Sequence, residues 1–110
     1  LELPEGLLVH ANHYRDPELI ALVGERAGEN TRAREELLDG FLRPRAGRLT
    51  LEDMMAGLRL TEGPHPVCRP RPADPKAVST CAAAIMCPQR RTIWIAAGHP
   101  AEAEFEALEV

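Results

Sequence analysis

The chain has 110 residues, 45% of them hydrophobic and 27% charged, which is typical of one globular domain or of a piece of one. Its net charge of −4 argues against nucleic acid as a partner, because nucleic-acid binding needs a basic surface. No apolar run approaches the ~20 residues that cross a bilayer, and the first residues lack an export signal, so we expect a cytoplasmic protein without a membrane partner.

Residues 6–12 carry a short apolar run and are predicted to form a buried strand. The strand ends in the polar sequence His10-Ala11-Asn12-His13-Tyr14. Side chains alternate along a strand, so we expect the first histidine, the asparagine and the tyrosine on one face and the second histidine on the other.

Asn12 is the strongest candidate for chemistry in this segment. Its amide offers two hydrogen-bond donors and has no proton to lose, which suits the stabilisation of a developing oxyanion in acyl transfer. The alternative from these residues alone is that Asn12 caps the end of the strand and that His10 and His13 are structural side chains.

Three helices are predicted from their start signals. Asp16-Pro17-Glu18 combines an N-cap acceptor, a proline at the first helical position and an acid in the first turn. A second helix is expected to begin after Asn30 or Thr31 and to end at Arg43-Pro44, because the residue before a proline avoids the helical conformation. The sequence Thr50-Leu51-Glu52-Asp53 resembles a capping box and starts a third helix.

Each predicted helix is expected to bury one apolar side. In the first helix this side consists of Leu19, Leu22 and Val23, and Gly24 or Gly28 ends the segment. In the second helix it consists of Ala33, Leu37, Leu38 and Phe41, while Arg32, Arg34, Glu35 and Glu36 are expected largely outside. In the third helix it consists of Leu51, Met54, Met55 and Leu58.

The C-terminal third is predicted to form an antiparallel hairpin, with strands at residues 79–86 and 92–97. Within the second strand, Trp94 is expected on the face opposite to the two isoleucines. The acidic residues 101–110 are expected to form a last edge strand or a loose end.

Before the hairpin, five prolines among residues 63–75 predict a long extended connection, which Val67-Cys68 is expected to pin to the core. The chain has an odd set of three cysteines, Cys68, Cys81 and Cys87, so they cannot all pair with one another, and we expect free thiols. Neither these cysteines nor the histidines of residues 10–14 have the spacing of a zinc site, so no metal and no cofactor is expected.

The order of these features is more telling than any one of them. They are the His-Ala-Asn-His-Tyr strand end, the helix start Thr31-Arg32-Ala33-Arg34, the sequence His65-Pro66-Val67-Cys68-Arg69, the hairpin start Ser79-Thr80-Cys81 and the hairpin end at residues 90–100. In this order, nearly all of residues 1–110 resemble the C-terminal part of one domain of peptidase family C45, the acyl-coenzyme A:6-aminopenicillanic acid acyltransferase-like proteins.

The resemblance implies an α+β fold, part of the αββα sandwich of the N-terminal-nucleophile hydrolases, with an antiparallel sheet packed against helices. Members of that family cut themselves before a cysteine, whose freed α-amine then serves as the base for its own thiol. They hydrolyse amides or transfer acyl groups, so the expected substrate is a small-molecule amide or an acyl thioester such as acyl-coenzyme A. Asn12 matches the family's Asn-His-aromatic motif and is expected in the oxyanion hole, with His10, His13 and Tyr14 as supporting or substrate-binding side chains.

The chain departs from the family pattern in two places. The nucleophilic cysteine should lie before Asn12, so we expect it in an N-terminal remainder of the domain, and residues 1–110 alone should be inactive. Some members carry a Ser-Arg pair near the hairpin start, where residues 76–80 here contain no arginine. Half of a sandwich would also expose an apolar sheet face, which allows a homo-oligomer.

Three other functions compete with this interpretation. The first is a non-catalytic α+β binding module or a degenerate relative of the family. The second is a helix-turn-helix regulator, suggested by Arg32 and Arg34 but disfavoured by the acidic balance and the C-terminal strands. The third is a hydrolytic triad of Ser79 and Asp16 with a histidine of residues 10–14, although no nucleophile-elbow glycines surround the serine.

Overall fold

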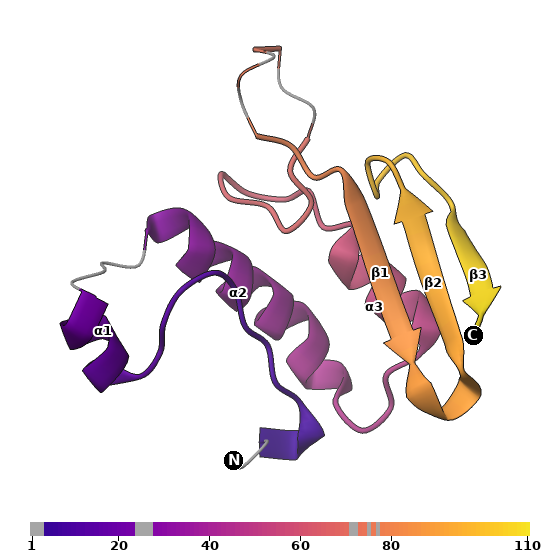
Figure 1. The fold of residues 1–110 in the computed structure, drawn as a ribbon, viewed down its shortest axis with the longest axis horizontal. Helices are drawn as coiled ribbons and strands as arrows, with labels where there is room; N and C mark the ends of the chain where they lie inside the picture. The colour runs from indigo at the N-terminus through magenta and orange to yellow at the C-terminus, as the bar shows by residue number, and fades with distance from the viewer. Residues whose placement is uncertain (1–3, 24–27, 71–72, 75, 77) are drawn as a thin grey trace.

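The computed structural model describes residues 4–23, 28–70, 73–74, 76 and 78–110 of the chain. It has the expected α+β class, with helices packed against a three-stranded antiparallel sheet (Figure 1). The helices are α1 (Pro17–Val23), α2 (Glu29–Leu42) and α3 (Leu51–Leu58), and the strands are β1 (Ala82–Cys87), β2 (Thr92–Ala97) and β3 (Phe105–Glu109). Short 3₁₀ turns occupy Pro4–Gly6, Arg43–Arg45 and Pro88–Arg90. None of the described helices is long and apolar enough to cross a membrane.

The first segment differs from its prediction, because residues 7–11 form no strand. They run alongside α2 (Figure 1), and α2 side chains bind their backbone where a neighbouring strand would have done so. The amide of Ala11 donates to Glu35 Oε2 at 2.9 Å, and the amide of Asn12 donates to Thr31 Oγ1 at 2.8 Å. Val9 is buried as its apolar character suggests.

Helix α1 begins where its start signal places it. Asp16 Oδ1 accepts a hydrogen bond from the amide of Glu18 at 2.8 Å, as an N-cap side chain does. The expected buried side of α1 is wrong, since Leu19 is exposed and Leu22 is 80% exposed. The side chain of Val23 and residue Gly24 lie outside the described residues.

Helix α2 begins at Glu29, two or three residues before the expected start, and ends at Leu42 just before Arg43-Pro44. The expectation for its charged side is only half right. Arg32 and Glu36 are exposed, but Arg34 is half-buried and Glu35 is buried. These two side chains are covered because the side of α2 that carries them faces the polar segment of residues 10–15.

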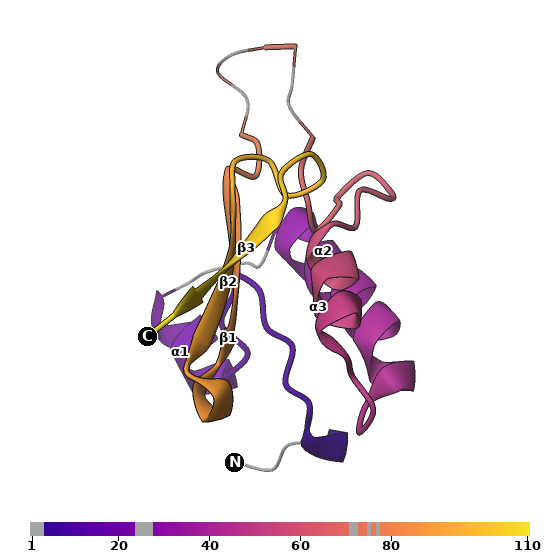
Figure 2. The same ribbon diagram turned by 90° about the vertical axis from the view of Figure 1, so that its right-hand side faces the viewer.

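Helix α3 has the predicted capping box. The amide of Asp53 donates to Thr50 Oγ1 at 3.1 Å, and the amide of Thr50 donates to Asp53 Oδ2 at 3.0 Å. The expected apolar residues of α3 are each half-buried. Helix α3 contacts both α2 and β1, and the two helices lie on the same side of the sheet (Figure 2); the buried Gly57 of α3 allows the close approach of α2.

The sheet has the order β1-β2-β3 with antiparallel neighbours throughout. Ile85 pairs with Trp94, so Trp94 lies on the face opposite to the two isoleucines of β2, as predicted. The hairpin turns through Arg91, which has a left-handed φ of 50°. The residues expected to be strand at 79–81 precede β1, and residues 105–109 form the expected edge strand.

The two faces of the sheet differ in exposure. Ile85 and Ala96 lie on one face and are buried. The opposite face is mostly apolar and is open or half-open; it carries Ala82, Ala84, Met86, Ile93, Ile95, Ala97 and Leu108, with Glu106 as its one charged residue among the described strands. We call this second set of side chains the open sheet face.

The proline-rich connection is pinned to the core as expected. Cys68 has no exposed surface, and its amide donates to the carbonyl of Leu60 at 2.7 Å. Its Sγ lies 3.7 Å from Nε2 of the buried His99, which follows β2. Cys68, Cys81 and Cys87 are free thiols, as predicted.

Candidate functional site around Asn12

One side of α2 binds the polar segment of residues 10–15. Thr31, Arg34 and Glu35 stand three and four positions apart, so they project from the same side of the helix. Each of them contacts a different part of the segment. Together they fix its path without a strand partner.

Glu35 is the most heavily bonded of the three. Its carboxylate accepts the amide of Ala11, forms an ion pair with Arg15, and lies 3.5 Å from His13 Nε2. The residue is only 8% exposed. A buried carboxylate is costly unless it is paired and hydrogen-bonded, and these three partners meet that requirement.

Thr31 continues the same network at the next turn. Its hydroxyl oxygen accepts the amide of Asn12 and lies 3.0 Å from His13 Nδ1. A neutral His13 satisfies every contact when the Thr31 hydroxyl donates to Nδ1 and Nε2–H points at Glu35. These contacts hold His13 against α2.

Asn12 has its side chain oriented by Arg34. Arg34 Nη2 donates to Asn12 Oδ1 at 2.9 Å, and a guanidinium can only donate, so the acceptor must be the amide oxygen. The donors of the Asn12 side-chain NH₂ then face away from this bond, and no described residue accepts a hydrogen bond from them. Asn12 is exposed, so a ligand can reach them.

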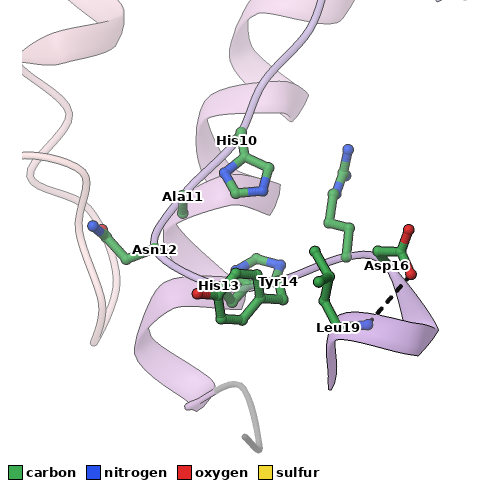
Figure 3. Close-up of a pocket in the computed structure, with 8 residues that line it drawn as sticks. His10, Ala11, Asn12, His13, Tyr14, Asp16 and Leu19 are labelled. Carbon is green, nitrogen blue, oxygen red and sulfur yellow. Dashed lines mark hydrogen bonds between the residues drawn. The ribbon is translucent and has the colours of Figure 1, made fainter. Parts of the chain in front are cut away.

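The expectation that His10, Asn12 and Tyr14 share one face is wrong. The chain bends at Asn12 and His13, so strand alternation does not apply. The rings of His10 and His13 stack with their centroids 5.6 Å apart. The side chain of Asn12 extends to the opposite side of the segment from His10 and Tyr14 (Figure 3).

A hollow of about 540 Å³ lies along this segment. Its lining comes from residues 10–16 together with Leu19 of α1 (Figure 3). Tyr14 and Leu19 are exposed there and give the hollow an apolar side. The structure thus brings His10, Asn12, His13 and Tyr14 into one neighbourhood, with the asparagine aimed away from the three rings.

Arg34 also contacts Asn30, which reaches the proline-rich segment before the hairpin. Its Nε donates to Asn30 Oδ1 at 2.8 Å, and Asn30 Nδ2 lies 3.3 Å from His65 Nδ1. Partial burial lowers the pKa of Arg34, and the positive charge of nearby Arg69 lowers it further. The Asn12 amide oxygen therefore lies beside the positively charged guanidinium of Arg34.

Cys68 is inaccessible to a substrate, and His13 and Asp16 of the alternative triad do not contact each other among the described residues. Cys68 has no exposed surface, so no substrate can reach its thiol. His13 contacts Thr31 and Glu35, and Asp16 caps α1, so these two residues are engaged elsewhere and not with each other. Within the described part of the chain, no group of three or more His, Cys, Asp or Glu side chains is placed to hold a metal ion.

The sequence interpretation missed the α2 side chains of this site. The sequence pattern predicts Thr31 at the start of the helix and Arg34 and Glu35 on its outer, charged side. Their i, i+3, i+4 spacing was the available signal, because it places three polar groups on one side of a helix. Comparisons with protein-family models, with curated proteins and with solved structures find no match to this chain.

Proposed function

We propose that this chain is the C-terminal part of a cysteine-dependent, self-processing amide hydrolase or acyltransferase of the N-terminal-nucleophile type. In this proposal Asn12 donates to the oxyanion, and the nucleophilic cysteine comes from a preceding part of the same domain. The acceptor of the acyl group is water or an amine. The family suggested by the sequence is the acyltransferase-like family named above.

The observation that carries the proposal is the contact between Arg34 and Asn12. Because Arg34 holds the amide oxygen, the NH₂ group has a fixed direction before any substrate binds. An oxyanion donor is effective when it is oriented in advance, since no reorganisation is then needed as charge develops. Asn12 is also neutral, so it does not compete for the proton of the attacking thiol.

The open sheet face supports the same proposal from the fold. Met86 is 68% exposed and Leu108 is 53% exposed on a face whose other side chains are alanine, isoleucine and, on β3, Glu106. Apolar sheet faces are normally covered by a second layer. An αββα sandwich would cover this face with a second sheet, supplied by the remainder of the domain.

The proposed reaction needs only groups of the enzyme and its substrate. The cysteine thiolate attacks the amide carbonyl carbon, and the carbonyl oxygen takes the negative charge beside the Asn12 NH₂ group. The thiol proton passes through the α-amine of the cysteine to the departing amine. Water or another amine then attacks the resulting thioester and releases the acyl group.

The experiment uses the polypeptide expressed from the start codon of its gene, with maturation confirmed by mass spectrometry. We expect Asn12→Ala to lower amide cleavage or acyl transfer by about 10²–10³-fold with folding preserved, as for a lost oxyanion donor. Asn12→Asp should be at least as harmful, because a carboxylate repels the oxyanion. Gln89→Ala, which removes an exposed amide in the hairpin turn, is the control. Full activity of a folded Asn12→Ala enzyme would remove Asn12 from the mechanism.

The competing proposal is a non-catalytic binding module. The hollow beside Tyr14 and Leu19 favours it, because that hollow can hold a ligand without any nearby nucleophile. A full-length protein that contains no self-cleavage site and hydrolyses no amide, yet binds a ligand in this hollow, would replace the enzyme proposal.

A further inference from the structure

A line of three side-chain contacts joins Asn12 to His65. Arg34 Nη2 donates to Asn12 Oδ1 at 2.9 Å, Arg34 Nε donates to Asn30 Oδ1 at 2.8 Å, and Asn30 Nδ2 lies 3.3 Å from His65 Nδ1. These four side chains, which we call the Arg34 network, come from the polar segment, from α2 and from the proline-rich connection. The first bond orients Asn12 directly, and the other two act on it only through Arg34.

The direction of every bond in the Arg34 network follows from the guanidinium. A guanidinium only donates, so Asn30 must present its amide oxygen to Arg34 and its NH₂ group to His65. The NH₂ group also only donates, so Nδ1 of His65 must accept and carries no proton in this arrangement. Protonation of Nδ1 would set two donors against each other and break the bond, because Asn30 cannot turn its amide over without losing Arg34.

Both ends of the contact between Asn30 and His65 are anchored. Asn30 and Arg34 stand four positions apart on the same side of α2, and the helix starts one residue before Asn30, so this side chain is not spent on capping the helix. His65 directly precedes the buried Pro66, and Cys68, two residues further on, has no exposed surface. The connection therefore holds His65 in a defined place beside α2.

The described surroundings offer a proton on His65 no compensation. The charged group that the Arg34 network itself contains is the cation Arg34 on α2. In the connection, Glu62 stands three positions before His65 and Arg69 four positions after it, and Glu62 is exposed. No described carboxylate is paired with His65. A proton on Nδ1 would thus break the bond to Asn30 without gaining a described acceptor.

We propose that Asn30 and His65 are positioning residues, which hold Arg34 and through it the NH₂ group of Asn12 in one orientation as long as Nδ1 of His65 carries no proton. Acid then loosens Asn30 first, and the guanidinium and the Asn12 amide after it. The effect on catalysis rests on the donor role proposed above for Asn12. The coupling between His65 and the Asn12 amide does not, because it can be observed without turnover.

The test uses the mature polypeptide expressed from the start codon of its gene, with its asparagine side chains labelled with ¹⁵N. Asn12 and Asn30 are the two asparagines of residues 1–110, and their signals are assigned with Asn12→Ala and Asn30→Ala. We expect the NH₂ signals of both to move in NMR spectra at the pH at which the His65 ring titrates. In His65→Asn, whose side-chain oxygen can accept the same bond at any pH, this movement should disappear. Glu62→Gln removes an exposed carboxyl from the same connection and should leave the movement unchanged.

Kinetics at a pH above that titration give the second readout. Asn30→Ala should lower kcat about tenfold with KM unchanged, which is less than the ~10²–10³-fold loss expected for Asn12→Ala. His65→Asn should lose less activity than His65→Ala, because only the alanine variant lacks an acceptor for Asn30.

The two readouts fail in different ways. Asn12 signals that do not follow the titration of His65, or that move at the same pH in His65→Asn, would overturn the proposal. Signals that behave as expected in an enzyme whose Asn30→Ala variant keeps full activity would support the Arg34 network and would instead remove Asn12 from the reaction.

Discussion

Replacing Glu35 is the sharpest test of how the candidate site is held together. In Glu35→Ala the amide of Ala11 loses its acceptor, Arg15 loses its ion pair, and His13 loses its neighbour. All three losses fall on the segment of residues 10–15. We therefore expect this segment to detach from α2, while the contact of α2 with α3 remains.

The magnitude follows from the contacts. A hydrogen bond to a charged group contributes about 1.5–3 kcal/mol, and the Ala11 bond is of this kind. The Arg15 side chain is 54% exposed, so its ion pair adds only about 0–1 kcal/mol. Together these give about 1.5–4 kcal/mol for closing the segment onto α2. Glu35→Gln keeps an acceptor oxygen but loses the charge, so we expect a loss of about 1 kcal/mol.

The assay is hydrogen exchange of the Ala11 and Asn12 amides, followed by NMR. A loss of about 1.5–4 kcal/mol corresponds to exchange that is roughly 10–1,000 times faster. Glu36→Ala, the exposed neighbour on α2, should leave both amides unchanged. Unchanged exchange in Glu35→Ala would refute the role of Glu35, and equal acceleration in Glu36→Ala would show that helix stability alone controls the segment.

Three further predictions concern the helices and the sheet. Gly40→Ala should raise the free energy of unfolding by up to ~1 kcal/mol, because its Cβ would meet nothing within 4 Å, whereas Gly57→Ala should gain less, because its Cβ would lie 3.0 Å from a leucine of α2; urea titration compares them. The hydrogen bond from the Thr50 backbone lowers the pKa of Asp53. The capping box should therefore stabilise the fold fully above about pH 4 and lose this contribution as the pH falls through the lowered pKa. Asp53→Asn should flatten the dependence of the melting temperature on pH below about pH 4. The chain alone should self-associate through the open sheet face, and Met86→Lys should reduce this in sedimentation experiments; a monomer that melts cooperatively at high temperature would contradict it.

Local signals predicted the elements that depend on local contacts. The Asp16 cap and the Thr50–Asp53 capping box each bond within three residues, so their sequence patterns were sufficient. The hairpin of β1 and β2 follows in the same way from two apolar segments joined by a short turn. The α+β class followed from the order of these elements.

Contacts between distant residues decided what the sequence could not predict. The apolar run at residues 7–9 is typical of a strand, but Glu35 and Thr31 bind the backbone that follows it, 24 and 19 residues away in sequence. The burial of Glu35 has the same cause, because its partners are specified by the tertiary arrangement and not by the helix pattern. The alternation expected for residues 10–14 depended on the strand and failed with it.

Arg34 determines how the Asn12 side chain is oriented in the candidate site. It orients the oxygen of Asn12, which leaves the NH₂ group as a donor. A lysine at this position could carry the charge, but it would lack the fixed planar arrangement of donors that binds Asn12 and Asn30 at once. A carboxylate partner for Arg34 would compete with Asn12 for the guanidinium. The neutral partners Asn12 and Asn30 therefore fit a guanidinium that orients a donor, as the proposed oxyanion site needs.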